Sequence, residues 1–492
     1  MPPFANLEGL PYLSILIFAP LIAAAFTAFI SDARLVRWWT LGVTVAAAIF
    51  SVNLYIGFFA ETHYFQFVES HSWIPSLKIN YTLGVDGISL LLILLTTLIT
   101  PLCVLASWTY IKVRVKEFMI ALLVMEGAMV GVFSALDTVL FFVFWEAMLI
   151  PMALMIGVWG GPRKIYASMK FFIYTMAGSV FLLVAIIAMR LQTGSFDLQS
   201  TMGHPFSHGF QSWVFAAFFI SFAIKVPMFP FHTWLPAAHV EAPTAGSVIL
   251  ASVLLKMGTY GFLRFALPIT PWAAVHFAPA LMWLSVVGIV YGGLAALAQA
   301  DMKKLVAYSS VGHMGFCTLG IFSLNIQGIE GATLVMINHG VTTGALFICV
   351  GIIYERLHTR DLAKSAGIGK FMPILATFLG FFCLSSLGFP GTNSFIGEFL
   401  VLAGGFKIST LLVCCAVPGV VAAAAYNLRM LQRLVYGGTD NPDHTGTPDL
   451  NFREILTLAP LLVFVLWIGL NPQPFVKIMH ESVVHLLQQA GR

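Results

Sequence analysis

The stretch FISFAIKVPMFPF at residues 219–231 decides how the rest of the chain is interpreted. It is apolar enough for the middle of a membrane-spanning helix, yet it contains Lys225 and is broken by Pro227 and Pro230. A charged lysine near the centre of a bilayer costs roughly 2.5–3.5 kcal/mol on insertion scales, and a proline removes a backbone hydrogen-bond donor from a helix. A buried cation beside a helix interrupted at membrane depth is typical of an ion pathway.

The composition predicts a polytopic membrane protein. Of the 492 residues, 59% are hydrophobic and only 9% are charged, whereas a soluble domain carries about 25% charged residues. The six cysteines show no CxxC pattern, so we expect neither a metal site nor a disulfide framework. The chain has no phosphate-binding glycine loop and no cysteine cluster for an iron–sulfur centre, which argues against a nucleotide-binding or redox domain within it. The first residues, MPPFANLEGLPYL, lack the basic region of a cleaved signal peptide, so we expect the first apolar segment to be retained.

The apolar segments predict an all-α fold of about 14 transmembrane helices, because about 20 apolar residues span a bilayer. The expected spans are 11–30, 37–59, 83–109, 117–135, 138–159, 166–190, 211–230, 243–267, 273–297, 305–323, 331–354, 372–403, 408–434 and 454–471. The longest polar stretches between them, 61–82, 191–210 and 435–453, are expected to be loops.

The basic residues between these helices predict the orientation, since an excess of lysine and arginine marks cytoplasmic loops. One side of the expected topology carries Arg34, Arg37, Lys112, Arg114, Lys116, Arg163, Lys164, Lys170, Lys303, Lys304, Arg356, Arg360, Lys364, Lys370, Arg429, Arg433 and Arg453. The other side carries only Lys78, Arg190, Lys407, Lys477 and Arg492. Both termini are therefore expected on the periplasmic side. Arg264, near the end of its helix, is expected to extend toward a membrane interface.

A second apolar span is interrupted in the same manner as the first. FLGFFCLSSLGFPGTNSFIGEFLVL at residues 378–402 contains a Gly-Phe-Pro-Gly break at 388–391, and Glu398 lies beyond it. Asp137 and Asp301, each at the start of a span, are about as far apart in the sequence as the two interruptions are. Proline kinks are common in membrane helices, but matching interrupted spans in two halves of a chain indicate a transporter binding site. The ionisable residue beside each break favours a functional role.

Six ionisable residues lie well inside the expected helices: Glu146, Lys225, Lys256, His313, His339 and Glu398. Glu146 and Lys225 have opposite charges that would each be costly alone, so we expect them to pair. A buried lysine can be charged or neutral, and imidazole titrates near neutral pH. These six ionisable residues, taken together, therefore predict a proton relay. Glu126 also falls in an apolar run, but no role is assigned to it.

Two other interpretations of these residues stay open at this point. Glu146 and Lys225 could form a structural salt bridge, in which case the buried charges would only align the helices. His313 and His339 could instead be axial ligands of a haem, although an electron-transfer span would usually supply four such ligands in two pairs. Lys256, a second cation without an evident partner, favours the relay.

Six long motifs resemble those of a known family. They are YTLGVDGISLLLILLT (81–96), GVFSALDTVLFFVFWEAMLIPM (131–152), FAIKVPMFPFHTWLPAAHVEAPTAGSVILASVLLK (222–256), DMKKLVAYSSVGHMGF (301–316), INHGVTTGALF (337–347) and GFPGTNSFIGEF (388–399). The chain resembles the antiporter-like membrane subunits of bacterial NADH:quinone oxidoreductase (respiratory complex I), which share their fold with multisubunit Na+/H+ antiporters. Glu398 makes it similar to the M type, because the L and N types carry a lysine there.

The resemblance implies a fold of two inverted five-helix repeats, helices 4–8 and 9–13, with helices 7 and 12 broken. Helices 1–3 would occupy residues 1–110, the first repeat 111–268 and the second repeat 269–435. A cytoplasmic loop, helix 14 and the C-terminus would occupy 436–492. The resemblance further implies the roles of the six residues: Glu146 as the essential glutamate, Lys225 as its partner, Lys256 as the connecting lysine, His313 and His339 as the central histidines, and Glu398 as the distal acid.

The function implied by the resemblance is proton translocation coupled to quinone reduction elsewhere in the complex. NADH, FMN, iron–sulfur clusters and quinone would belong to other subunits, with no cofactor or metal in this chain. The implied partners are L-type and N-type subunits and lipids, without nucleic acid, in the bacterial inner (plasma) membrane. The alternative with the same fold is a subunit of a multisubunit Na+/H+ antiporter or of a membrane-bound hydrogenase.

Overall fold

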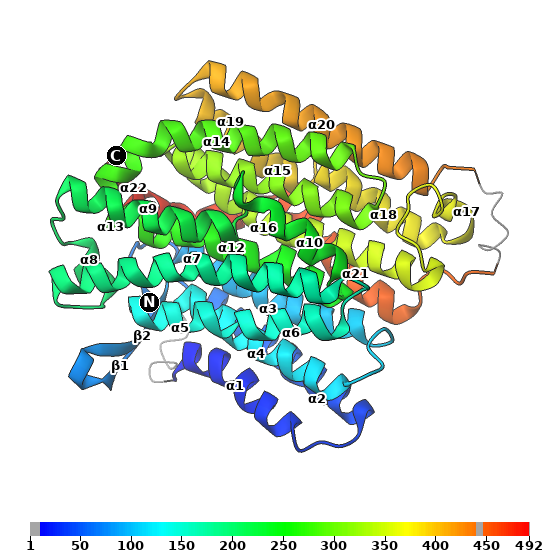
Figure 1. Cartoon of the computed structure of the whole chain (residues 1–492), viewed down its shortest axis with the longest axis horizontal. Coiled ribbons are helices and arrows are strands. Elements are labelled where there is room, and N and C mark those ends of the chain that lie inside the picture. The colour runs from blue at the N-terminus through cyan, green and yellow to red at the C-terminus, as the bar shows by residue number, and fades with distance from the viewer. Residues whose placement is uncertain (1–9, 439–445, 492) are drawn as a thin grey trace.

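A computed structural model describes residues 10–438 and 446–491 and shows an almost entirely helical bundle. The long helices run side by side along the longest axis of the molecule (Figure 1). In the described part of the chain, eleven helices are long and apolar enough to cross a membrane, and three further apolar helices are shorter. The prediction of a polytopic helical membrane protein is confirmed.

The described residues up to Met202 contain seven helices that follow the apolar segments closely and one short helix inside the stretch 191–210, where the expectation of a loop was wrong. They are α1 (Tyr12–Thr27), α2 (Ala33–Gly57), α3 (Gly87–Ser107), α4 (Val115–Ser134), α5 (Thr138–Ala147), α6 (Leu149–Trp159), α7 (Lys164–Thr193) and α8 (Leu198–Met202). Residues 1–9, which include most of the sequence used to argue against a signal peptide, lie outside the described residues. Asp32 shows how such a helix begins, because its carboxylate accepts hydrogen bonds from the first N–H groups of α2.

Part of the stretch 61–82, expected to be a loop, forms a β-hairpin with the residues that follow it. β1 (Gln66–Ile74) pairs antiparallel with β2 (Ile79–Val85), and Lys78 turns the chain in the left-handed conformation. The side chain of Glu69 accepts a 2.7 Å hydrogen bond from the N–H of Leu13, which fastens the hairpin to the start of α1. The expectation was wrong because β1 is polar and mostly exposed, so it lacks the alternation of buried apolar residues that marks a strand.

The segment around Lys225 is interrupted as its prolines require. α9 (His208–Lys225) ends at the lysine, and α10 (Trp234–Glu241) begins only after a short 3-10 turn, Phe231–Thr233. Two carbonyls at the end of α9 find other donors: Met228 N–H donates to Ala223 O and the Trp234 indole N–H donates to Ile224 O, each at 2.7 Å. These bonds allow a helix to end inside the bundle without leaving those carbonyls unpaired.

The second interrupted span consists of α18 (Pro373–Ser386) and α19 (Asn393–Phe406). Between them, Gly388 and Gly391 adopt φ values of +77° and +91°. A side chain with a Cβ is strained in this left-handed region, so glycine is needed at both positions. Glu398 follows in the second turn of α19 and is buried.

The helix that carries Lys256 is completely enclosed by other helices. It runs as α11 (Thr244–Ile249), α12 (Leu255–Gly261) and α13 (Leu267–Ile269), with π-helical turns at Leu250–Leu254 and Phe262–Ala266 between them. π-Helical turns within α-helices are frequent at functional sites.

The remaining helices complete the bundle around α15 and α16, which are almost wholly buried. They are α14 (Pro271–Leu297), α15 (Met302–Phe322), α16 (Ile326–Leu357), α17 (Ile368–Phe371), α20 (Thr410–Leu434), α21 (Phe452–Leu470) and α22 (Gln473–Gln489). α22 was not expected; one face of it, including Met479 and Val483, is buried, and the helix packs against α3 and α16. Of the expected loop at 435–453, residues 439–445 lie outside the described residues.

Asp137 and Asp301, which stand at the start of two spans, occupy matching local structures. Asp137 caps α5 and forms an antiparallel bridge with Asp197, while Asp301 caps α15 and forms an antiparallel bridge with Asp361. α8, which follows Asp197, lies at the left end of the bundle in Figure 1, and α17, which follows Asp361, lies at the right end.

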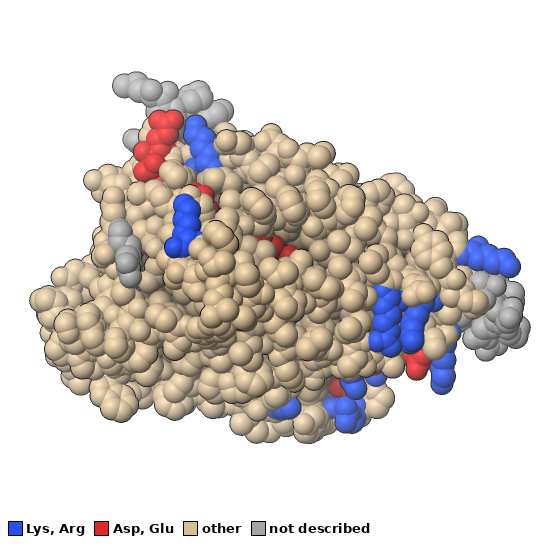
Figure 2. Space-filling model, turned by 90° about the horizontal axis from the view of Figure 1, so that it is seen from above, with Lys and Arg blue, Asp and Glu red and all other residues tan. Residues whose placement is uncertain are grey.

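The two ends of the bundle differ in charge. The beginning of α1 and the helix α22, near the two ends of the described chain, lie at the left side of Figure 1, and lysines and arginines gather at the opposite end in the view of Figure 2. One residue that was grouped with the loop cations differs from the rest, because the side chain of Lys303 is buried and its ammonium donates a 2.5 Å hydrogen bond to Ala242 O. That residue belongs to the interior at the start of α15 rather than to a loop.

Candidate functional site

Lys256 and His339 are in direct contact at the centre of the bundle. The Lys256 Nζ lies 2.6 Å from the His339 Nδ1 and 2.5 Å from the carbonyl oxygen of Ala251. Lys256 is fully buried, and His339 is 3% exposed. Since the lysine donates to the ring nitrogen, the two side chains, from α12 and α16, can exchange a proton directly.

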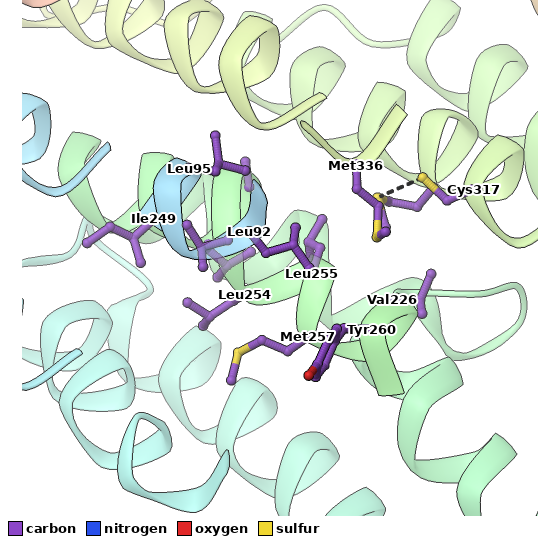
Figure 3. Close-up of a cluster of buried hydrophobic side chains, with 14 of the residues drawn as sticks. Leu92, Leu95, Val226, Ile249, Leu254, Leu255, Met257, Tyr260, Cys317 and Met336 are labelled. Carbon is purple, nitrogen blue, oxygen red and sulfur yellow. Dashed lines mark hydrogen bonds between the residues drawn. The ribbon is translucent and has the colours of Figure 1, made fainter. Parts of the chain in front are cut away.

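The surroundings of this pair are apolar. Figure 3 shows leucines of α3, including Leu92 and Leu95, beside Leu254 and Leu255 of the Lys256 helix, with Met336 of α16 and Cys317 of α15 close by. A charge in such a region has little solvent to stabilise it, so its energy depends strongly on the few polar groups that touch it.

A second contact joins His313 of α15 to Glu398 of α19. The His313 Nδ1 lies 2.9 Å from Glu398 Oε1, and both side chains are 7% exposed. The other ring nitrogen, Nε2, lies 3.3 Å from the Ser386 hydroxyl and 3.3 Å from the Tyr426 hydroxyl. Ser386 is the last residue of α18, so the second helix interruption places both a hydroxyl and a carboxylate against one imidazole.

The two contacts meet at a small cavity. The ring centroids of His313 and His339 are 5.7 Å apart. The cavity between them has a volume of about 10 Å³ and is also lined by Asn338, Thr342 and Glu398, and a site of this volume with several polar partners suits one water molecule. Lys256, His339, His313 and Glu398 therefore form one buried polar row across three helices and the broken span.

Lys225 and Glu146 lie at the other interrupted helix. Lys225 is 2% exposed, and its Nζ lies 5.0 Å from the centre of the Trp145 ring, a cation–π distance. Glu146 follows Trp145 in the sequence, and its carboxylate is close enough for its charge to act on the ammonium of Lys225. No ion pair of 4.0 Å or less joins them among the described residues, and Glu146 Oε1 is buried without a hydrogen-bond partner there. The structure thus brings the two residues into one region and places the indole against the ammonium.

Arg264 does not extend to an interface as expected. It is 9% exposed and forms an ion pair of 2.5 Å with Asp86, and its guanidinium also donates to Ser89 and Tyr260. Burial alone would raise the pKa of Asp86, but the charge and the hydrogen bond of Arg264 outweigh burial and hold the pKa below its ordinary value. The expectation was wrong because an arginine inside a bundle with a carboxylate partner gains more from the pair than from reaching the membrane surface.

Comparison with known proteins identifies the family. The family model described as NADH:quinone oxidoreductase/Mrp antiporter, TM, matches residues 135–424, and the model for NADH-ubiquinone oxidoreductase chain 4, amino terminus, matches residues 14–131. The chain belongs to this family.

Relatives with similar sequences extend over almost the whole chain. NADH-quinone oxidoreductase subunit M of Rhodobacter capsulatus is 48% identical over 495 residues, covering 97% of this chain and 96% of the relative. NADH-ubiquinone oxidoreductase chain 4 of Marchantia polymorpha is 46% identical over 490 residues, covering 99% and 98%. A chain of respiratory complex I from Thermus thermophilus with bound NADH superposes with a TM-score of 0.90 at 30% identity, covering 98% of this chain and all of that one. The resemblance drawn from the motifs is confirmed.

Several polar residues of this antiporter-like chain were missed by the sequence analysis. Ser386 and Tyr426 contact His313, and Asn427 donates to Ser386. His239 of α10 is fully buried against Phe347, and neither of its ring nitrogens has a protein partner in the described structure. A histidine in the quoted motif at 222–256 was a signal that could have been used, whereas the hydroxyl and amide residues have no such signature.

Glu126 is separate from the row. It is fully buried on α4, and both of its carboxylate oxygens lack a hydrogen-bond partner among the described residues. The structure assigns it no place in the contacts between Lys256 and Glu398.

The haem interpretation does not fit the geometry. Both ring nitrogens of His313 are within hydrogen-bond distance of protein groups, so His313 offers no free nitrogen, whereas His339 has its Nδ1 against Lys256 and its Nε2 without a partner among the described residues. An axial ligand must leave one nitrogen free to face the iron. Among the residues that the structure describes, no group of three or more His, Cys, Asp or Glu side chains is arranged to hold a metal ion.

Proposed function

We propose that this chain is the M-type proton-translocating membrane subunit of an NADH:quinone oxidoreductase. The observation that carries the proposal is the buried row in which Lys256 contacts His339, Glu398 contacts His313, and the two imidazoles flank a water-sized cavity. Lysine, imidazole and carboxyl groups can each bind and release a proton, and rows of such groups inside membranes are characteristic of proton pathways. Relatives named for this function support the assignment.

The magnitudes are compatible with electrostatic coupling along the row. Two unit charges about 6 Å apart interact by roughly 3 kcal/mol at an effective dielectric constant near 20. Moving one charge against 100 mV costs about 2.3 kcal/mol. A change of charge on one member of the row can therefore shift a proton on the next one against a membrane potential of ordinary size.

Glu146 and Lys225 control the row in this proposal. A change in the charge of Glu146 alters the electrostatic potential at Lys225, and Lys225 in turn acts on Lys256. The buried position of Lys225 beside Trp145 supports this role, because an ammonium held by an aromatic ring and a nearby carboxylate responds to the charge of that carboxylate. Protonation would then pass from Lys256 through His339 and His313 to Glu398. The direction of the coupling reaction lies with the subunits that oxidise NADH and reduce quinone.

The proposed fold has fourteen spans. Eleven are the long apolar helices, and α1, the pair α9 and α10, and the pair α18 and α19 complete the set. The inverted repeats would occupy 111–268 and 269–435, after helices 1–3 in 1–110 and before the segment 436–492. The matching aspartate bridges, one at each end of the bundle, support an inverted relation between the halves.

The proposed setting is the bacterial inner membrane, with both termini on the periplasmic side. The gathering of lysine and arginine at the end opposite α22 and the beginning of α1 supports this orientation. L-type and N-type subunits are the proposed neighbours, and NADH, FMN, iron–sulfur clusters and quinone are assigned to other subunits.

A matched pair of lysine substitutions tests the proposal. The complex is purified from its native membrane, its subunits are identified, and it is reconstituted in vesicles with a pH-sensitive dye. Lys256→Gln should abolish proton uptake driven by NADH, whereas Lys407→Gln, which removes an exposed ammonium bonded to Gln327, should leave it unchanged. Full pumping in the Lys256 variant would refute the relay. Copurification without flavin and iron–sulfur subunits would instead favour a Na+/H+ antiporter.

A further inference from the structure

A surface pocket at the lysine- and arginine-rich end of the bundle is lined by two basic side chains, those of Arg163 and Lys304. It has a volume of about 220 Å³ and lies among α7, α10 and α15, with Arg163, Tyr166, Lys304 and Tyr308 in its wall. This volume is far larger than the ~10–15 Å³ that one water molecule needs. The pocket is thus large enough for part of an organic ligand.

The charge of the pocket favours an anion. In the part of the chain that the structure describes, neither the Arg163 guanidinium nor the Lys304 ammonium has a hydrogen-bond or ion-pair partner. The pocket also contains Glu241, but one oxygen of its carboxylate accepts the N–H of Arg163 at 2.9 Å, and its charge faces the buried ammonium of Lys303. Glu241 is therefore engaged with the protein, while the two cations remain available.

The pocket continues into an apolar surface. Ile165, Met169 and Ile173 of α7 are 65%, 51% and 57% exposed, and Met176 extends the same stripe. The twelve residues from Ile165 to Met176 cover ~17 Å of helix, which is close to half of the ~30 Å hydrocarbon core of a bilayer. The stripe begins beside Arg163 and therefore has the length of one leaflet, measured from the charged end inward.

We propose that this pocket binds the phosphate headgroup of an anionic glycerophospholipid, with an acyl chain lying along the α7 stripe. Arg163 and Lys304 contact the phosphate, and the hydroxyls of Tyr166 and Tyr308 are placed to donate hydrogen bonds to its ester region. Basic pockets between membrane helices on the cytoplasmic side are suited to such headgroups. The occupant is a lipid rather than a soluble anion because the same site offers a cationic end and a one-leaflet apolar track.

The test uses the whole complex in phosphatidylcholine vesicles that contain a trace of photoactivatable phosphatidylglycerol or, in parallel, photoactivatable phosphatidylcholine. After irradiation, labelled peptides are mapped by mass spectrometry. Each basic residue near the membrane surface is worth about a fivefold gain in anionic-lipid binding, so two predict a preference of about thirtyfold for phosphatidylglycerol at residues 163–176. Arg163→Gln with Lys304→Gln should reduce this ratio to near one.

Controls separate the alternatives. Arg34→Gln with Lys112→Gln removes two exposed cations that do not line the pocket, and this variant should keep the preference. A ratio near one in the unmodified complex would overturn the proposal. Displacement of the label by inorganic phosphate at the same total lipid would show a soluble-anion site instead. A photoreactive amino acid at Ile165 that labels a neighbouring subunit and no lipid would show that protein covers the surface, which would also overturn it.

Discussion

Replacement of Glu398 by glutamine is the sharpest test of the buried row. The substitution keeps the size of the side chain and removes its charge, and Glu398 Oε1 lies only 2.9 Å from His313 Nδ1. Opposite unit charges ~3 Å apart attract by roughly 5–6 kcal/mol at an effective dielectric constant near 20. Because burial also carries a desolvation cost, the net stabilisation from this contact is that of a hydrogen bond to a charged group, ~1.5–3 kcal/mol.

The expected functional loss follows from that energy. An imidazolium at His313 that loses ~1.5–3 kcal/mol of stabilisation slows any step that places a proton on it by about ten- to a hundredfold. Glu398→Gln should therefore lower the number of protons moved per NADH oxidised, measured with a pH-sensitive dye in vesicles whose NADH oxidation is followed at the same time. The complex should still assemble, because no other ion pair of the described residues includes Glu398.

The chain offers a matched control for this experiment. Glu330 of α16 forms an equivalent carboxylate–imidazole contact with His480 of α22, with a distance of 2.6 Å, but neither residue lines the cavity at His313. Glu330→Gln should leave the proton yield unchanged. If Glu398→Gln pumped as well as the unmodified complex, or if both variants lost pumping equally, Glu398 would not be a station on the proton path.

Three further predictions concern the other charged and interrupted sites. Glu146→Ala should abolish proton translocation and strongly reduce coupled quinone reduction without preventing assembly, as judged by native gels and vesicle assays; full pumping would contradict its controlling role. Trp234→Phe removes the 2.7 Å hydrogen bond from the indole to Ile224 O at the end of α9 and should lower the free energy of unfolding by ~1–3 kcal/mol. The loss would be measured as a lower unfolding temperature of the complex, and an unchanged temperature would show that another donor replaces the indole. Asp86→Asn should lower the free energy of unfolding by ~3–5 kcal/mol, because it leaves Arg264 buried without its carboxylate partner; the loss would be measured as a lower unfolding temperature of the complex.

The Asp86 pair also predicts a pH dependence with a definite sign. Since Arg264 holds the pKa of Asp86 below its ordinary value, the folded protein binds that proton more weakly than the unfolded chain does. The stabilisation is complete above pH ~4, the ordinary pKa of an aspartate, and is lost as the pH falls through the lower folded value. Between pH 7 and pH 3, the unfolding temperature of the unmodified complex should fall more steeply than that of the Asp86→Asn variant. Parallel curves would contradict the role of this pair.

The breaks at Lys225 and before Glu398 could be predicted because they depend on local chemistry. Pro227, Pro230 and Pro390 lack an N–H wherever they are placed, and Gly388 and Gly391 allow backbone angles that other residues resist. The ionisable side chains beside the breaks could likewise be found by their cost in an apolar segment. In contrast, the β-hairpin and α22 have weak local signals, and contacts with α1, α3 and α16 stabilise them instead.

The amino-acid sequence by itself determined that this is a helical membrane protein of the antiporter-like family with six ionisable residues inside apolar segments, because hydrophobicity, missing donors and motif identity are properties of the chain. Only the tertiary structure decided which of these residues touch. It joined Lys256 to His339 and His313 to Glu398, left Glu146 and Lys225 without a direct ion pair, and turned Arg264 inward to Asp86. The reason is physical: a contact of 2.6–2.9 Å depends on how separate helices pack and rotate against one another, and spacing along one helix does not specify that rotation.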